Sequence, residues 1–554
     1  MMSGKEVARR ACASLASAAL LFGAGHAAAE SAPRRAGLLP APPAVLAQLQ
    51  TIPRASAPVA ADPDIFPALD APPVVDWLAA GVRPAPPEAE TGDVVLDLAW
   101  ALVPQDRRDL AAALDVWVKA TPAGPAAADR RRLRAALADA YTAHGYEPFW
   151  RSADGWREAA TAALQRLRGA GEDGLDLRDL ALPAPEKNAP DAEDELALSE
   201  AVGTYALQAG GARIDPQRLS RLIGARPTPP EPASVIATVA AAGAQAGEVL
   251  QQFNPPHYGY QALRAKLAEL RAEHAKTEPA SDQRLAEAVE GASQNDAEPP
   301  LGRVGRRRAV TLAKASTSRI EAEVLANMER WRWLPRDLGD EHVEVNIPDF
   351  ELAVVRDGQV AHRARIIVGK EQTPTPVFSN AVQFIIVNPY WNVPPSIINK
   401  EMLPKAGGDV SAIEQHGFKV SYRHGKLIVR QPPGERNALG RIKFMFPNDF
   451  AVYLHDTPSR GLFSASHRAF SHGCMRVEAP FALAEAVLGP GSGWSEQRVR
   501  RLIGGSERYI NLSKPLPIHI EYFTAYVDEA GRLVQRPDLY GYSARVRRAL
   551  GLDG

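Results

Sequence analysis

The chain has 554 residues, more than one hydrophobic core usually fills, so we expect two folded domains with linkers. Its formal net charge is −1 with 23% charged residues, which argues against general affinity for nucleic acid or anionic lipid. The hydrophobic content of 45% is ordinary for a water-soluble protein.

The first residues follow the pattern of a secretory signal. A basic region precedes the apolar run Ala13–Gly25, and the small residues Ala27 and Ala29 precede a cleavage point before Glu30. The apolar run is shorter than the ~20 residues that a membrane span needs. We therefore predict a signal peptide over residues 1–29 and no transmembrane span in the mature, exported chain.

The cysteine content becomes informative once the signal is removed. The sequence has two cysteines, and Cys12 lies within the predicted signal, so Cys474 would be the one thiol of the mature chain. Exported proteins usually pair their thiols, and a lone cysteine there is a candidate reactive group. The alternative is an inert buried cysteine.

The composition divides the mature chain into successive parts. Residues 30–91 are rich in proline and alanine and predict a disordered linker. Apolar residues then recur at helical spacing, and from about residue 340 the period changes to the alternation of strands. We expect an α+β multidomain chain, with a helical domain over 92–260, a helical connector over 261–335 and a mostly-β domain over 336–545.

The stretch from Tyr453 to Arg476 carries the residues expected for acyl-transfer chemistry. His455 precedes Cys474 by nineteen positions, and a thiol is a useful nucleophile only when a base or a positive neighbour gives the thiolate. His472 is a second candidate for the base. Gly473 permits backbone amides to converge on an oxyanion, and Arg476 is suited to a substrate carboxylate. The alternative of a metal site at His455, His467, His472 and Cys474 fits no standard zinc spacing.

The residues His455 and Ser471-His-Gly-Cys-Met-Arg476 resemble the signature of the L,D-transpeptidases of bacterial cell walls. Other blocks resemble the large, scaffold-containing periplasmic branch of that family, over most of residues 100–545. These blocks include Thr375-Pro-Val-Phe-Ser379 and Asn388-Pro-Tyr-Trp-Asn-Val-Pro-Pro395. The peptidoglycan-binding motifs common in that branch are not recognisable between residues 260 and 325, so that module is absent or diverged.

The resemblance implies a role for each residue of the motif. Cys474 would be the nucleophile and His455 the general base and acid. Ser471, His472 and Gly473 would support the site or the oxyanion. Arg476, Tyr453 and Trp391 would bind the donor peptide, under a cap inserted at about residues 392–445.

The implied reaction joins two peptidoglycan stem peptides through a 3–3 cross-link, with a thioester on Cys474 and release of D-alanine. It takes place in the periplasm, needs no metal or cofactor, and makes wall-synthesis proteins candidate partners; no nucleic acid is expected. Two alternatives stay open: an L,D-carboxypeptidase or hydrolase using the same acyl-enzyme, and a non-catalytic wall-binding protein. A sortase also uses His, Cys and Arg, but its Cys-to-Arg separation is usually longer.

Overall fold

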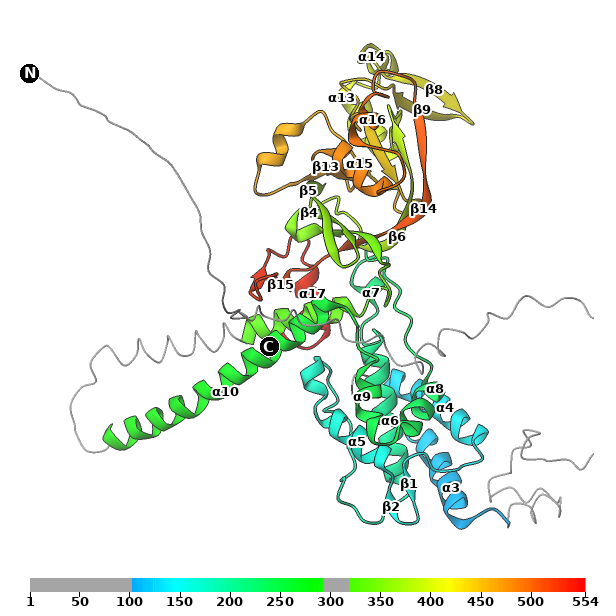
Figure 1. Ribbon diagram of the computed structural model, residues 1–554, viewed down its shortest axis with the longest axis vertical. Coiled ribbons are helices and arrows are strands. Elements are labelled where there is room, and N and C mark those ends of the chain that lie inside the picture. The colour runs from blue at the N-terminus through cyan, green and yellow to red at the C-terminus, as the bar shows by residue number, and fades with distance from the viewer. Residues whose placement is uncertain (1–101, 123, 125, 293–317, 554) are drawn as a thin grey trace, which may run out of the picture. The chain divides into compact units, whose positions relative to one another are not determined.

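The computed structural model describes residues 102–292 and 318–553, apart from residues 123 and 125 and the side chains of residues 277–292. These residues lie within one compact unit, Asp76–Gly554 (Figure 1). The predicted signal and proline-rich linker fall outside the described residues. Within those residues, no helix is long and apolar enough to cross a bilayer.

The helical domain is built around α6 (Ala192–Ala209), which is buried along most of its length. Asp191 begins this helix with a capping box, in which its side chain accepts hydrogen bonds from the backbone of Glu193 and Asp194. The surrounding helices supply leucine, alanine and aromatic side chains to one hydrophobic core. They are α3 (Gln105–Lys119), α4 (Ala127–Ala143), α5 (Glu158–Arg168), α8 (Pro232–Ala241) and α9 (Ala246–Gln251).

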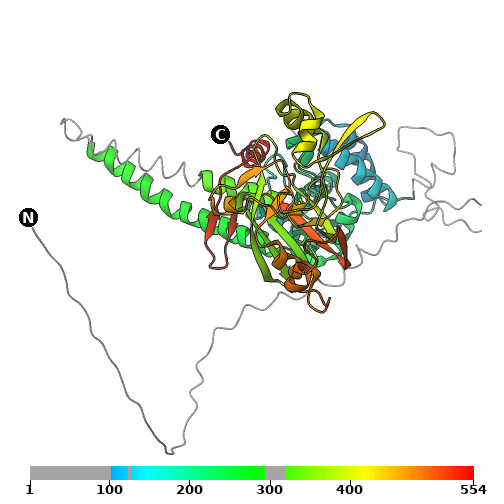
Figure 2. The ribbon, with the colours of Figure 1, turned by 90° about the horizontal axis from the view of Figure 1, so that it is seen from above.

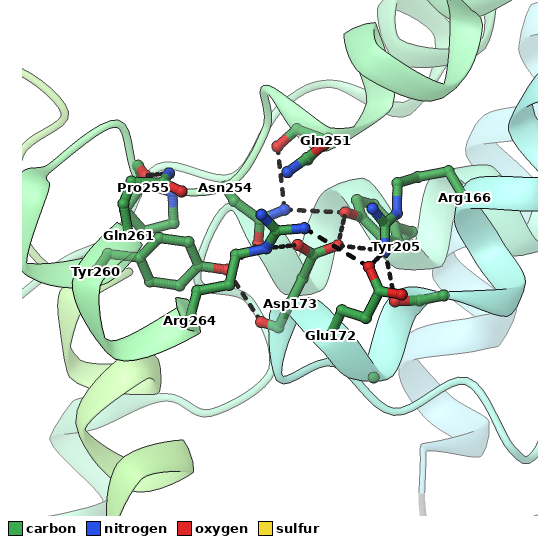
Figure 3. A network of polar contacts seen from close by, with 12 residues as sticks. Arg166, Glu172, Asp173, Tyr205, Gln251, Asn254, Pro255, Tyr260, Gln261 and Arg264 are labelled. Carbon is green, nitrogen blue, oxygen red and sulfur yellow. Dashed lines mark hydrogen bonds and ion pairs between the residues drawn. The ribbon is translucent and has the colours of Figure 1, made fainter. Parts of the chain in front are cut away.

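A buried polar network lies where this domain meets the connector helix α10 (Tyr258–Ala292) (Figure 3). Asp173, which is fully buried, accepts hydrogen bonds from the Tyr205 hydroxyl at 2.5 Å and from Arg264 Nε at 2.7 Å. Arg166 adds an ion pair at 3.4 Å. Asn254 donates to the Tyr205 hydroxyl at 2.9 Å. Both oxygens of this buried carboxylate are therefore compensated by charged or hydroxyl donors.

The connector continues in a helix over residues 318–331, which packs against α10. Leu263 of α10 and Met328 of that helix share a small core with Trp331 and Phe523. Glu323 of the same helix accepts hydrogen bonds from Thr524 and Ser543 and pairs with Arg547. These contacts tie the connector to the C-terminal part of the chain.

The mostly-β domain contains a nine-stranded sheet of mixed direction. Its order is β12-β5-β13-β11-β10-β6-β14-β3-β4, and β4 also pairs with β5, so the sheet curls into a barrel-like shape. The strands are β3 (Glu341–Asn346), β4 (Glu351–Arg356), β5 (Gln359–Gly369), β6 (Phe378–Val387), β10 (Ile442–Met445), β11 (Leu454–His455), β12 (Ala469–Ser471), β13 (Met475–Val477) and β14 (Arg508–Glu521). The helices α15 (Pro480–Leu488), α16 (Glu496–Arg500) and α17 (Tyr542–Ala549) accompany this sheet.

Short β-type hydrogen bonds join the helical domain to this sheet. Gly224 N–H donates to the carbonyl of Val377, and Val377 N–H donates to the carbonyl of Leu222, both at 2.8 Å. Ile223, which lies between them, is buried in the core of the β domain. The predicted α+β class, with a helical domain followed by a mostly-β domain, is confirmed.

A small cap is inserted between β6 and β10. It contains a three-stranded sheet, β7 (Trp391–Asn392), β8 (Lys419–Arg423) and β9 (Lys426–Gln431), with short helical segments between β7 and β8. Val393, Ile398, Ile413 and Val429 form its own core. Figure 2 shows the β8–β9 hairpin, in yellow, standing clear of the large sheet.

The upper boundary predicted for the cap, about residue 445, is wrong by one strand. Ile442–Met445 forms β10, which pairs with β6 and β11 inside the large sheet. Ile442 and Phe444 are fully buried in the core of the β domain. The apolar alternation of this segment therefore belongs to the nine-stranded sheet and not to the insertion.

Candidate active site

The site lies on one face of three adjacent strands. Lys443 of β10 is the register partner of His455 in β11, and His455 is the register partner of Arg476 in β13. Neighbouring partners in a sheet direct their side chains to the same face. The alternate residues Phe444, Leu454 and Met475 are fully buried in the core. Lys443, His455 and Arg476 therefore form a row on the opposite face.

Cys474 precedes β13 and lies beside Tyr453, because Met475 N–H donates to the carbonyl of Tyr453 at 3.2 Å. Each of these residues stands two positions before a member of the row, Arg476 and His455 respectively. The Tyr453 side chain hydrogen-bonds with Cys474, and its ring packs edge-on against His455 with centroids 5.7 Å apart, so the thiol lies on the same face as the imidazole. The structure thus places Cys474, His455, Tyr453 and Arg476 on one face.

The strand that ends at His455 is shorter than expected. The sequence pattern of residues 450–455 is typical of one continuous strand, but β11 comprises Leu454–His455 alone. Ala451 has a φ of 55°, and the Asn448 amide donates to the carbonyl of Val452 at 2.8 Å. A local turn therefore replaces the first part of the predicted strand.

His455 is 5% exposed, and its Nδ1 lies 2.5 Å from the carbonyl oxygen of Asp456. A carbonyl accepts, so Nδ1 carries the proton and Nε2 is the basic nitrogen. Burial, together with the positive charges of Arg476 and Lys443, lowers the pKa of His455 to about 3, and the hydrogen bond to the Asp456 carbonyl opposes this shift. The imidazole is therefore neutral and able to accept a proton at neutral pH.

A compact turn holds the cysteine. Ser471, which is 2% exposed, accepts a hydrogen bond from Gly473 N–H at 3.1 Å and donates to the carbonyl of Cys474 at 2.5 Å. Gly473 has a φ of +116°, a conformation that residues with a side chain rarely adopt. The Gly473 N–H is thus already used. Among the hydrogen bonds of the described residues, the Cys474 N–H has no acceptor.

A loop after β5 holds this turn in place through hydrogen bonds of Thr375. The buried hydroxyl of Thr375 donates to the carbonyl of Gly473 at 2.8 Å and accepts from Gly369 N–H at 2.9 Å. In a trans peptide the C=O and N–H point in opposite directions. Fixing the Gly473 carbonyl on Thr375 therefore aims the Cys474 N–H away from Thr375.

The thiol is protonated at rest. Burial raises the pKa of Cys474 to about 11, while hydrogen bonding by Tyr453 and the charges of Arg476 and Lys443 act in the opposite direction. Since burial also keeps His455 neutral, the two groups favour a thiol–imidazole pair at rest over a thiolate–imidazolium pair. Proton transfer is then required when the nucleophile attacks.

His472 faces the cap. Its Nε2 lies 2.7 Å from a carboxylate oxygen of Glu401, which belongs to the short helical segment Ile398–Met402. Trp391 also approaches the site from the cap, where its side chain hydrogen-bonds with Tyr453. His467 packs edge-on against the ring of Phe350, with centroids 5.6 Å apart. His455, Cys474 and Arg476 of the predicted motif therefore lie on one face of the sheet, whereas His472 contacts the cap.

Three further residues at the site were missed by the sequence analysis: Thr375, Glu401 and Lys443. Thr375 lies in one of the family-like blocks, which was the available signal. Lys443 alternates with Ile442 and Phe444, a pattern that in isolation indicates a solvent-facing lysine. Only the strand pairing places it beside His455.

Two regions of the chain match known families. Residues 340–501 match the L,D-transpeptidase catalytic domain, and residues 135–267 match a scaffold domain. The first range contains every residue of the catalytic face described above.

A protein of Haemophilus influenzae named "Putative L,D-transpeptidase" is 35% identical over 255 residues, 42% of this chain and 50% of that protein. The chain thus spans about half the length of this curated relative. Two solved structures, an Ldtfm–avibactam carbamoyl enzyme and a cysteine-to-serine mutant of the Enterococcus faecium L,D-transpeptidase, are each 14% identical. Each covers 33% of this chain, 49% and 50% of its own chain respectively, with a TM-score of 0.18, at which neither contributes to the assignment. The family matches and the curated relative confirm the resemblance: the chain carries an L,D-transpeptidase catalytic domain that follows a scaffold domain.

Proposed function

We propose that the protein forms 3–3 cross-links between peptidoglycan stem peptides through a thioester on Cys474. The observation that carries this proposal is that the Cys474 thiol and the neutral, oriented imidazole of His455 both lie against the Tyr453 side chain. The match to the L,D-transpeptidase catalytic domain supports the class of reaction.

In the first half-reaction, Nε2 of His455 takes the proton of the Cys474 thiol as the sulfur attacks the carbonyl of the third stem residue, a diamino acid. The tetrahedral intermediate then expels the terminal D-alanine. His455 returns the proton to the departing amine, and the bond between Cys474 and the acyl group remains as a thioester.

In the second half-reaction, the side-chain amine of a neighbouring stem attacks the thioester carbonyl. His455 accepts a proton from that amine and returns it to the leaving sulfur. The new amide joins two third residues, and the thiol of Cys474 is restored. Water in place of the amine would give hydrolysis.

The unused N–H of Cys474 is the donor best suited to the oxyanion, because Ser471 already binds the Gly473 N–H. Gly473 and Ser471 thus shape the turn, and His472 connects it to the cap through Glu401. Arg476, Tyr453 and Trp391 are proposed to hold the donor peptide. Export to the periplasm places the enzyme beside its stem-peptide substrates and candidate wall-synthesis partners.

The test is incubation with a disaccharide-tetrapeptide, followed by mass spectrometry of the products. Wild type is expected to release D-alanine and form a 3–3 dimer, and Cys474→Ala to form none. Tripeptide without dimer would favour the carboxypeptidase alternative. If incubation with a carbapenem leaves the mass of the protein unchanged, so that Cys474 is not acylated, the non-catalytic alternative is favoured.

A further inference from the structure

Lys443 is a buried cation on the catalytic face. It is 9% exposed, and its register partner is His455. Its Nζ lies 5.5 Å from the centre of the Tyr453 ring. Among the described residues, no carboxylate lies within ion-pair distance of Nζ and no oxygen accepts a hydrogen bond from it. Burying a charged group in this manner is costly unless a partner compensates it.

The charges around the site do not balance. Arg476, on the other side of His455, has a buried Nε without an acceptor. Two acidic groups act on Lys443, the Glu507 carboxylate and the Cys474 thiol. One oxygen of Glu507 already accepts from Tyr390 N–H at 2.7 Å. Arg430 adds a third positive charge near Lys443. The catalytic face therefore has positive charge that an anionic ligand would compensate.

The strand order indicates where each cation meets the ligand. Cys474 directly precedes β13, which contains Arg476. β11, which contains His455, lies between β13 and β10, and β10 contains Lys443. The acyl carbon of the donor must lie at the sulfur of Cys474, and the leaving nitrogen must lie at His455 to receive its proton. The next groups of the departing amino acid, its Cα and carboxylate, then extend past His455 in the direction of β10.

We propose that Lys443 binds the C-terminal carboxylate of the donor stem, on the amino acid that leaves. This inference rests on the proposed function and names a specificity determinant of the same site. It has a consequence for substrate length: a stem with one more residue carries an amide at this position, which has no charge to pair with Lys443. Lys443 therefore selects stems that end directly after the leaving residue.

The test compares two donors in each variant: a disaccharide-tetrapeptide with a free C-terminal carboxylate, and the same molecule as its C-terminal amide. The kcat/KM for release of alanine or of alanine amide is measured by mass spectrometry. Wild type is expected to prefer the carboxylate by about 10- to 100-fold, the range of one charge-assisted hydrogen bond. Lys443→Met should lose this preference, Lys443→Arg should keep part of it, and Lys266→Met, a lysine of α10, should keep all of it.

The ratio of the two donors within one variant cancels any change in thiol reactivity. Alkylation of Cys474 by iodoacetamide and the thermal midpoint show whether each variant is folded. A preference that persists in Lys443→Met, or that disappears in Arg476→Met instead, would overturn the assignment. If wild type uses both donors equally well, the role proposed for Lys443 is refuted while the proposed function stands. If wild type releases neither alanine nor alanine amide, the proposed function itself is refuted.

Discussion

Two buried polar regions of this chain differ in how their charges are compensated. In the helical domain, the carboxylate of Asp173 binds Tyr205, Arg264 and Arg166, and its backbone carbonyl accepts from Tyr260 and Arg332 (Figure 3). On the face that carries Cys474, Lys443 and Arg476 flank His455, and among the described residues neither cation forms an ion pair.

The difference separates structural charges from functional ones. A compensated network loses stability when a member is removed, because the remaining charges are left buried and unpaired. An uncompensated cation already costs stability in the free protein, and a ligand can relieve that cost. The cost of burying an unpaired charge thus predicts that removing a charge lowers stability in the helical domain and does not lower it on the face that carries Cys474.

The largest expected effect is on the catalytic face. His455→Ala removes the proposed base for the thiol proton, so acylation of Cys474 by a carbapenem should slow by about 10²–10⁴-fold. The rate is measured by mass spectrometry of the intact protein. Near-normal acylation in His455→Ala, together with a large loss in His472→Ala, would assign the base to His472.

Breaking the compensated network should cost stability. Asp173→Asn leaves Arg166 and Arg264 beside a neutral amide, and we expect a loss of about 3–5 kcal/mol in the free energy of unfolding. The control is Asp115→Asn, which breaks the exposed pair with Lys119 in α3 and should cost less than about 1 kcal/mol. Equal thermal midpoints in the two variants would contradict a structural role for the network.

A substitution at Thr375, which holds the turn before Cys474, should have a smaller effect on catalysis than His455→Ala. Thr375→Val removes the hydrogen bond to the Gly473 carbonyl and should loosen the Cys474 N–H, the proposed donor to the oxyanion. Carbapenem acylation should fall by about 10- to 100-fold, while alkylation by iodoacetamide, which forms no oxyanion, should change little.

Thr375→Ser should restore the acylation rate, since it keeps the hydroxyl. Thr142→Val removes an equivalent hydroxyl-to-carbonyl bond within α4 and serves as the control. An equal loss of acylation and alkylation in Thr375→Val would indicate general damage to the site, contrary to an effect on the oxyanion.

A pH effect is expected at the connector. Burial lowers the pKa of His257 to about 4, from an unfolded value near 6.5. Between these values the unfolded chain binds a proton that the folded chain does not, so stability should fall as the pH drops through this window. His257→Gln should remove about 1–2 kcal/mol of that fall, because the ring is partly exposed and only partly desolvated. Identical pH profiles of thermal unfolding in wild type and variant would refute this account.

The smallest expected effect is an increase in stability, opposite in sign to the loss expected for Asp173→Asn. Lys443→Met replaces an uncompensated buried cation by an apolar side chain of similar length. We expect the free energy of unfolding to stay constant or rise by about 1 kcal/mol. A clear drop in the thermal midpoint would mean that Lys443 has a structural partner, and the contrast between the two regions would then fail.

The sequence predicted those features that depend on local pattern. Helical and alternating periods separated the two domains, and the lone thiol and its neighbours marked the catalytic turn. The role of Lys443 was not predictable, because it depends on which strands pair and in which register. The turn at Ala451 shortens β11. It uses a left-handed backbone conformation, which is rare for alanine and therefore not predictable from the sequence. The end of the cap was misplaced because alternation does not reveal to which sheet a strand belongs.

The two ends of the cap meet at its base. The N–H of Asn388, directly after β6, donates to the carbonyl of Arg441, directly before β10, at 2.8 Å. The insertion therefore leaves and re-enters the barrel at one point, so its length adds little strain to the frame. Caps of different length and sequence could be exchanged at this point as interchangeable modules. The cap could thus be exchanged by recombination without rebuilding the residues that hold Cys474.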